Sequence, residues 1–204
     1  MVSEPSLHIA LIGDSIFDNA AYTNGGADTV SHLRRMMGNT GQATLLAMDG
    51  ATTHMIPDQV ARLPEHVTHV AVSIGGNDLL PVMSVLHESF DSPVGILVEL
   101  DRFAQTFERD YRIALAAVAS QGLPSVVCLP YNGWFPEEPM KTALRTALRM
   151  FADVMRGVAI DHGLPVIDLR GVCTEEEDYW NPIEPNARGG EKVAEVVWRW
   201  VRGQ

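Results

Sequence analysis

Five short apolar runs recur along the chain, and each is followed by a longer stretch in which apolar residues return every three or four positions. The runs are continuous in Val, Ile and Leu, as in strands that are buried on both faces of a parallel sheet. They span residues 8–12, 43–48, 69–74, 125–129 and 165–169. The spacing between them predicts helices, among them four over residues 29–37, 100–119, 140–160 and 187–201.

This alternation predicts an α/β fold with a mostly parallel sheet and helices on both of its faces. A chain of 204 residues without repeats or linkers fits a single domain over residues 1–204. Residues 79–98 are irregular, because they contain Pro81, Pro93 and Gly95, yet they are apolar for a loop. This segment is predicted to be either a lid over the site or a helix that the pattern does not resolve.

Composition narrows the range of partners and locations. Acidic residues number 26 and basic residues 15, and the net charge of −11 argues against nucleic acid or an anionic membrane as the main partner. Cys128 and Cys173 are isolated, which excludes a disulfide scaffold and a cysteine-rich zinc site. No apolar run is long enough for a transmembrane segment, and no signal peptide is recognisable, so we expect a cytoplasmic location. Trp198 and Trp200 on the last predicted helix suit either the core or a homo-oligomer contact.

Candidate chemistry follows the first three strands, at the sheet edge where ligands of such folds bind. The first strand runs into Gly13, Asp14 and Ser15, the second precedes Gly50, and the third precedes Asn77 behind two glycines. Each feature also has a purely structural interpretation. Asp14 or Ser15 would cap a helix, Gly50 would serve a loop, and Asn77 would form an Asx turn.

Two further groups follow the fourth and fifth strands. Tyr131 and Trp134 would line an apolar substrate pocket or pack against the next helix. Asn181 and Glu184 precede the last predicted helix, for which Asn186 is the expected N-cap. These positions place Glu184 at the same edge of the sheet as the groups above.

Taken together and in this order, the motifs resemble the SGNH/GDSL hydrolase family over residues 8–201. The resemblance implies a flavodoxin-like three-layer α/β/α fold with a five-stranded parallel sheet, and hydrolysis of small-molecule esters or related acyl compounds without metal or cofactor. It also implies that Ser15 is the nucleophile, with its own N–H, the Gly50 N–H and the Asn77 amide as the oxyanion hole. Each such donor contributes about 2.7–4 kcal/mol to transition-state stabilisation.

The chain departs from the family's Asp-x-x-His-Pro block, because Asn181 replaces the aspartate and Glu184 replaces the histidine. Three hypotheses follow. In the first, His54 supplies the imidazole and Glu184 orients it, with His87 of the 79–98 segment as a remoter candidate. In the second, Glu184 is itself the base, and burial raises its pKa from about 4.3 toward 6–7. In the third, the relay is lost and the cleft only binds a ligand.

We therefore expect an esterase- or lipase-like serine hydrolase, with a catalytically silent binding module as the alternative. Asp14 either caps the turn, holds the nucleophile loop or contacts the substrate, together with Tyr131 and Trp134. A flavodoxin-like nucleotide binder is a weaker alternative, because Asp14, Asp49 and Asp78 would repel a phosphate and no glycine-rich phosphate loop is present. The acyl and alcohol specificity does not follow from the sequence.

Overall fold

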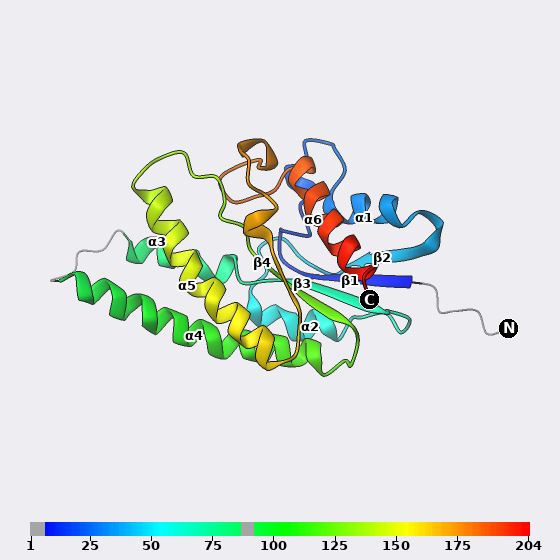
Figure 1. The fold of residues 1–204 in the computed structure, drawn as a ribbon, viewed down its shortest axis with the longest axis horizontal. Helices are drawn as coiled ribbons and strands as arrows, with labels where there is room; N and C mark the ends of the chain where they lie inside the picture. The colour runs from blue at the N-terminus through cyan, green and yellow to red at the C-terminus, as the bar shows by residue number, and fades with distance from the viewer. Residues whose placement is uncertain (1–6, 87–91) are drawn as a thin grey trace.

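The computed structural model describes residues 7–86 and 92–204, and within them five parallel strands form one sheet (Figure 1). The strand order is β2-β1-β3-β4-β5, which is the doubly wound order of flavodoxin-like folds. The strands are β1 (Leu7–Gly13), β2 (Gly41–Leu45), β3 (His69–Ser73), β4 (Ser125–Leu129) and β5 (Val166–Asp168). The predicted fold class is confirmed.

Helices cover both faces of the sheet, as Figure 1 shows. Side chains Ile9 and Leu11 of β1 point into a core shared with α1 and α6, whereas Ala10 and Ile12 point into a core shared with α2, α4 and α5. Both faces of β1 are therefore buried, which explains its unbroken apolar run. The helices are α1 (Thr29–Met37), α2 (Ile56–Val60), α3 (Val82–Val85), α4 (Pro93–Ala119), α5 (Met140–Asp161) and α6 (Ala187–Val201).

Helices α1 and α6 begin and end at the residues that the apolar spacing predicts. Each starts at a side-chain cap. Asp28 accepts a hydrogen bond from the Ser31 N–H at 2.8 Å, and Asn186 accepts one from the Arg188 N–H at 2.9 Å. The predicted capping role of Asn186 is confirmed.

The segment 79–98 is more helical than its sequence indicates. It holds α3 and the first turns of α4, which begins at Pro93 rather than at residue 100. The early turns of α4 expose Val94, Leu97 and Val98. Apolar residues therefore occur on the exposed face as well as on the buried one, and the helical period cannot be recognised in the sequence there. Residues 87–91, including His87, lie outside the described residues.

Strand β2 is displaced by two to three residues from its predicted range of 43–48. Its first residue, Gly41, pairs with Leu7 of β1. The N–H groups of Leu46 and Ala47 both donate to the Leu11 carbonyl, at 2.8 and 3.0 Å, so the regular ladder ends there. Met48 is therefore part of the exposed loop after β2 despite its apolar side chain.

The turn that leaves β1 depends on Gly13, whose φ is +132°. The next residue, Asp14, donates its N–H to the Ser73 carbonyl of β3 at 3.0 Å, and a Cβ at Gly13 would lie only 1.7 Å from that oxygen. The buried Gln59 side chain completes the arrangement, since it accepts from the Gly13 N–H at 2.6 Å and donates to the Gly13 carbonyl at 2.9 Å. Only glycine fits this turn without displacing β3.

We predict that Gly13→Ala lowers the free energy of unfolding by about 3 kcal/mol or more, because the methyl group collides with backbone in a left-handed turn. Gly157→Ala is the control, since Gly157 lies within α5 with no neighbouring atom in reach of a Cβ. That variant should gain about 0.5–1 kcal/mol. Urea denaturation of both variants measures the difference, and equal stabilities would contradict the assignment.

Candidate active site

A cavity opens at the carboxyl ends of β1 and β3, where the strand order reverses and ligands bind in folds of this kind. The space within it, its open mouth included, is about 820 Å³. Its walls come from the loops after β1, β3 and β4, from α3 and α5, and from the 181–186 loop before α6. Five of the residues singled out in the sequence line it, namely Asp14, Ser15, Asn77, Tyr131 and Glu184.

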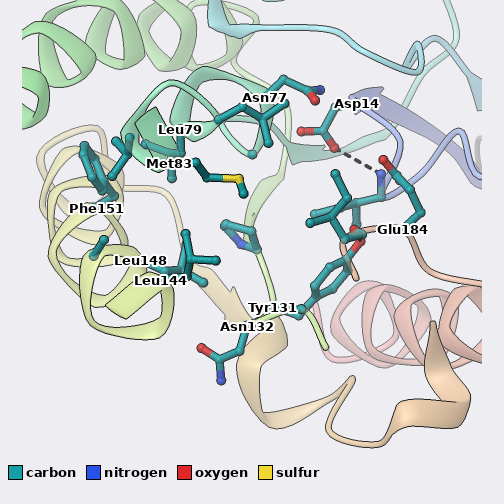
Figure 2. Close-up of a pocket in the computed structure, with 18 of the residues that line it drawn as sticks. Asp14, Asn77, Leu79, Met83, Tyr131, Asn132, Leu144, Leu148, Phe151 and Glu184 are labelled. Carbon is teal, nitrogen blue, oxygen red and sulfur yellow. Dashed lines mark hydrogen bonds between the residues drawn. The ribbon is translucent and has the colours of Figure 1, made fainter. Parts of the chain in front are cut away.

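The cavity has two chemically different ends, which Figure 2 shows. We call one end the apolar arm; it is lined by Leu79, Val82, Met83, Leu144, Leu148 and Phe151. The other, the polar end, is lined by Asp14, Ser15, Asn77 and Glu184. Among the described lining residues, the two carboxyl groups are the only charged side chains, and no basic residue accompanies them.

Ser15 sits at the start of the tight turn that follows β1, and only 6% of it is exposed. The Asp14 carbonyl accepts hydrogen bonds from the N–H groups of Phe17 and Asp18, at 3.1 and 3.0 Å. The Asp14 carboxylate accepts the Ile16 N–H at 3.1 Å. Asp14 thus holds the loop that presents Ser15 to the cavity.

Burial raises the pKa of Asp14 to about 7 from an ordinary value of 3.8. The neighbouring carboxylates of Glu184 and Asp78 contribute to this rise, while hydrogen bonds from the Ile16 and Gly76 N–H groups oppose it. Asp14 therefore exchanges its proton near neutral pH rather than in acid.

Glu184 is also buried, with 7% of its surface exposed. Burial raises the pKa of its carboxyl group, the nearby Ser15 hydroxyl lowers it, and the charge of Asp49 raises it again. One carboxylate oxygen, Oε2, is buried and has no hydrogen-bond partner in the described residues. The structure thus places a carboxylate beside the Ser15 hydroxyl, where the family pattern has an imidazole.

The backbone around Glu184 is held by a local turn. The Asn181 side chain accepts the N–H groups of Ile183 and Glu184, both at 2.9 Å, and the Glu184 carbonyl accepts the Trp180 N–H at 2.9 Å. The Tyr131 hydroxyl donates to the Ile183 carbonyl at 2.8 Å. Tyr131 therefore both lines the cavity and supports the loop that carries Glu184.

Asn19 is a positioning residue that the sequence analysis missed. Its amide nitrogen donates to the carbonyls of Pro185 and Asn186, at 3.1 and 3.2 Å, and its oxygen accepts the Thr29 N–H at 2.8 Å. It is fully buried and joins the Ser15 loop, the start of α1 and the Glu184 loop. The sequence shows only a polar residue soon after Ser15. It does not indicate what Asn19 bonds to, because the two carbonyl partners of Asn19 lie more than 160 residues away.

Asn77 donates its side-chain N–H to the Ala51 carbonyl at 2.8 Å. A primary amide has two N–H groups, and this contact uses one of them. Asp78 accepts the N–H and the hydroxyl of Thr53, and the loops after β2 and β3 are thereby joined. Gly50 precedes Ala51 on this joined loop and is exposed, but it does not itself line the cavity.

Besides Gly50, two predicted site residues, His54 and Trp134, do not line the cavity. His54 does not line the cavity; its side chain is 72% exposed and its Nε2 atom lies 3.4 Å from Asp110 Oδ2 on α4. The structure therefore does not bring His54 and Glu184 together in a relay. Trp134 is also absent from the cavity lining, since its ring lies 4.4 Å from Lys141 Nζ, and Phe135 contributes the aromatic wall instead.

Within residues 7–86 and 92–204, no three His, Cys, Asp or Glu side chains are grouped so that they could hold a metal ion. In the same residues, no helix combines the length and the apolarity needed to cross a membrane.

Comparisons with known proteins agree with this geometry. The model of the GDSL-like Lipase/Acylhydrolase family matches residues 11–192. No curated protein sequence matches the chain.

Solved structures resemble the chain over almost its whole length. An extracellular lipase from Streptomyces rimosus superimposes with a TM-score of 0.71 and 18% identity, over 94% of this chain and 98% of that chain. A lipase/acylhydrolase from Enterococcus faecalis gives 0.65 and 19%, over 97% and 96%. Phospholipase A1 from Streptomyces albidoflavus NA297 gives 0.67 and 18%, over 97% and 99%. At these identities the likeness establishes the fold.

We predict that Asp14 makes the stability of the protein depend on pH in an unusual direction. The native state binds the Asp14 proton more tightly than the unfolded chain does, so this stabilisation is complete below pH 3.8 and is lost as the pH rises to about 7. The unfolding free energy of the wild type should therefore fall relative to Asp14→Asn across this interval, by at most about 1.4 kcal/mol per pH unit. Urea denaturation at several pH values measures it, and a constant difference would refute the assignment.

Proposed function

Because this chain belongs to the GDSL-like Lipase/Acylhydrolase family, we propose that it hydrolyses acyl esters with Ser15 as the nucleophile and Glu184 as the general base. The observation that carries the proposal is that the Ser15 hydroxyl and the buried Glu184 carboxylate lie near each other at the polar end of the cavity. A hydroxyl next to a base is the arrangement that nucleophilic acyl transfer requires.

In the acylation step, the Ser15 oxygen attacks the ester carbonyl carbon while its proton passes to Glu184. The carbonyl π electrons move onto oxygen and give a tetrahedral oxyanion. Collapse of this intermediate breaks the bond to the leaving alcohol oxygen, which takes the proton from Glu184. The acyl group remains on Ser15, and the alcohol departs.

In the deacylation step, water attacks the acyl-serine carbonyl and gives its proton to Glu184. The second tetrahedral intermediate then expels the Ser15 oxygen, which regains that proton. The carboxylic acid leaves, and the enzyme returns to its starting state. The net reaction consumes one ester and one water and releases one acid and one alcohol.

The oxyanion of both intermediates needs donors that are in place before the reaction. The free N–H of the Asn77 amide is one donor, because its other N–H is bound to the Ala51 carbonyl and holds the side chain in position. The Ser15 N–H is a second donor, and the Gly50 N–H, on the loop joined to Asn77, is a third candidate. These roles follow the family resemblance.

A carboxylate is a weak base at its ordinary pKa, and burial is the means by which proteins strengthen it. Burial raises the pKa of Glu184 in this way, while the nearby Ser15 hydroxyl lowers it. The apolar arm is the natural place for the acyl chain, since Leu144, Leu148 and Phe151 would shield it from water.

We predict that Ser15→Ala lowers kcat/KM for p-nitrophenyl butanoate by at least about 10³-fold, because the nucleophile is gone. Glu184→Gln should lower it by about 10²- to 10⁴-fold, because glutamine keeps the shape but cannot accept the proton. His54→Ala is the matched control and should stay within about threefold, since His54 lies outside the cavity.

A fluorophosphonate probe followed by mass spectrometry tests the same roles without a chosen substrate. Labelling should occur at Ser15 in the wild type and in His54→Ala, and should fall in Glu184→Gln. Loss of labelling in His54→Ala would instead support the hypothesis in which His54 supplies the imidazole and Glu184 orients it. An unlabelled wild type without esterase activity would favour the binding module, in which the cleft keeps its shape without turnover.

We predict that Asn77→Ala lowers kcat by about 10²- to 10³-fold with little change in KM, because the lost donor acts on the transition state. Asn77→Asp should be equally impaired, since it keeps the side-chain shape without any N–H. Steady-state kinetics separate kcat from KM, and unfolding midpoints check that both variants are folded. A rise in KM alone would assign Asn77 to substrate binding instead.

A further inference from the structure

One stripe of α5 forms the wall of the cavity opposite the polar end. The residues of this stripe follow each other at steps of three and one, which places them on a single face of the helix. They are Leu144, Ala147, Leu148 and Phe151. Figure 2 shows Leu148 and Phe151 on the side of the cavity away from Glu184. An acyl chain that is attached to Ser15 and fills the apolar arm would therefore meet this stripe.

Ala147 is the small member of the stripe. Its side chain ends at Cβ, whereas those of Leu148 and Phe151 extend further from the helix. Ala147 nevertheless lines the cavity, so the cavity reaches the surface of the helix at this position. Ala147 and Phe151 are buried, whereas the mouth of the cavity is lined by exposed residues, Leu80 and Ile183. Ala147 thus forms a recess at the bottom of the apolar arm.

Closely packed core lies behind this recess. The Phe151 ring packs edge-to-face against Phe107 of α4, with centroids 5.7 Å apart, and Phe107 packs in turn against Tyr111 at 5.2 Å. Both aromatic residues of α4 are buried, and no described residue of α4 lines the cavity. Val82 of α3, on another wall, is buried in the same core. Since protein interiors have few voids, the apolar arm ends at α5.

We propose that the substrate carries a short acyl chain, whose terminal methyl group is seated against Ala147, and that Ala147 sets the upper limit on chain length. This inference deepens the proposed function and rests on it. A long acyl chain has no continuation of the apolar arm to enter, because the core behind α5 is filled. Its end would have to turn back to the mouth of the cavity and remain in water.

The free energy of burying methylene groups gives the proposal a measurable form. Each methylene group that moves from water into an apolar site increases kcat/KM by up to about fourfold. The increase continues only while the arm has room. Once the terminal methyl group reaches Ala147, a further methylene group either stays in water or displaces packed side chains, and displacement is unfavourable. The dependence of kcat/KM on chain length should therefore pass through a maximum.

A series of p-nitrophenyl esters tests this on the full-length chain, at concentrations where the esters are monomeric. We expect kcat/KM to rise by about two- to fourfold per methylene group from the acetate, and to reach its maximum at or before the octanoate. The value for the dodecanoate should be at least about fivefold below that maximum. Values that stay level or rise up to the dodecanoate would overturn the proposal and leave ester hydrolysis standing.

Two variants alter the recess in opposite directions. Ala147→Leu adds three carbon atoms at the bottom of the arm and keeps a good helix former, so it should lower the octanoate-to-acetate ratio of kcat/KM at least about tenfold. Leu148→Ala removes three carbon atoms beside the recess and should raise the decanoate-to-acetate ratio at least about threefold. It carries the test if Ala147→Leu does not fold, which unfolding midpoints show. Shifts of both ratios in the same direction would contradict the proposal.

Ala116→Leu is the matched control, because it makes the same substitution at an exposed position of α4 outside the cavity lining. Its octanoate-to-acetate ratio should equal that of the wild type. A fall of the same size in Ala116→Leu and Ala147→Leu would show that the effect does not come from the recess, and would overturn the proposal.

Calorimetry separates this inference from the proposed function, because Ser15→Ala binds an ester without turnover. Methyl octanoate should bind at least about tenfold more weakly to the double variant Ser15→Ala, Ala147→Leu than to Ser15→Ala. If the wild type hydrolyses no ester but this difference in binding is seen, the Ala147 recess stands and the hydrolase proposal fails. Equal binding to the two variants overturns the role of Ala147.

Discussion

The close approach of Gly13 to the Ser73 carbonyl is the constraint on which the site depends. It lets the chain leave β1 in a left-handed turn directly against β3, so that Asp14 bonds to Ser73 and Ser15 emerges at the reversal point of the sheet. The buried Gln59 side chain bonds to both the N–H and the carbonyl of Gly13, and so holds this turn against α2. The Ser15 loop is thus positioned by the sheet itself.

Around that turn, several side chains form hydrogen bonds to backbone carbonyls and so hold the loops in place. Asn19 joins the Ser15 loop to the Glu184 loop, Tyr131 supports the Glu184 loop from the β4 side, and Asn77 joins the loops after β2 and β3. The cavity is therefore enclosed by loops that are far apart in sequence yet mutually hydrogen-bonded. Glu184 is the exception, because its buried Oε2 atom has no partner in the described residues.

The fold was largely predictable, because a strand buried on both faces is an unbroken apolar run and an amphipathic helix has a regular period. The start of α4 was not, since Val94 and Leu97 are exposed and blur that period. The strand ends indicated that Ser15, Asn77 and Glu184 lie at one edge of the sheet, and all three line the cavity there. The same reasoning failed for His54 and Trp134, whose directions depend on partners on α4 and α5. No local pattern could reveal Asn19 either, because its partners are set by tertiary packing.

The two departures from the family pattern make sense as a pair. In a serine–histidine–aspartate relay, the aspartate stabilises the imidazolium that forms when histidine takes a proton. A glutamate base becomes neutral when it takes that proton, so an acid behind it would have no cation to stabilise and would only repel the ionised form. Asn181 fits this requirement, because its uncharged side chain shapes the turn by accepting the Ile183 and Glu184 N–H groups. In the proposed mechanism, Asn181 therefore leaves no second negative charge beside the Glu184 base and keeps the loop that presents it.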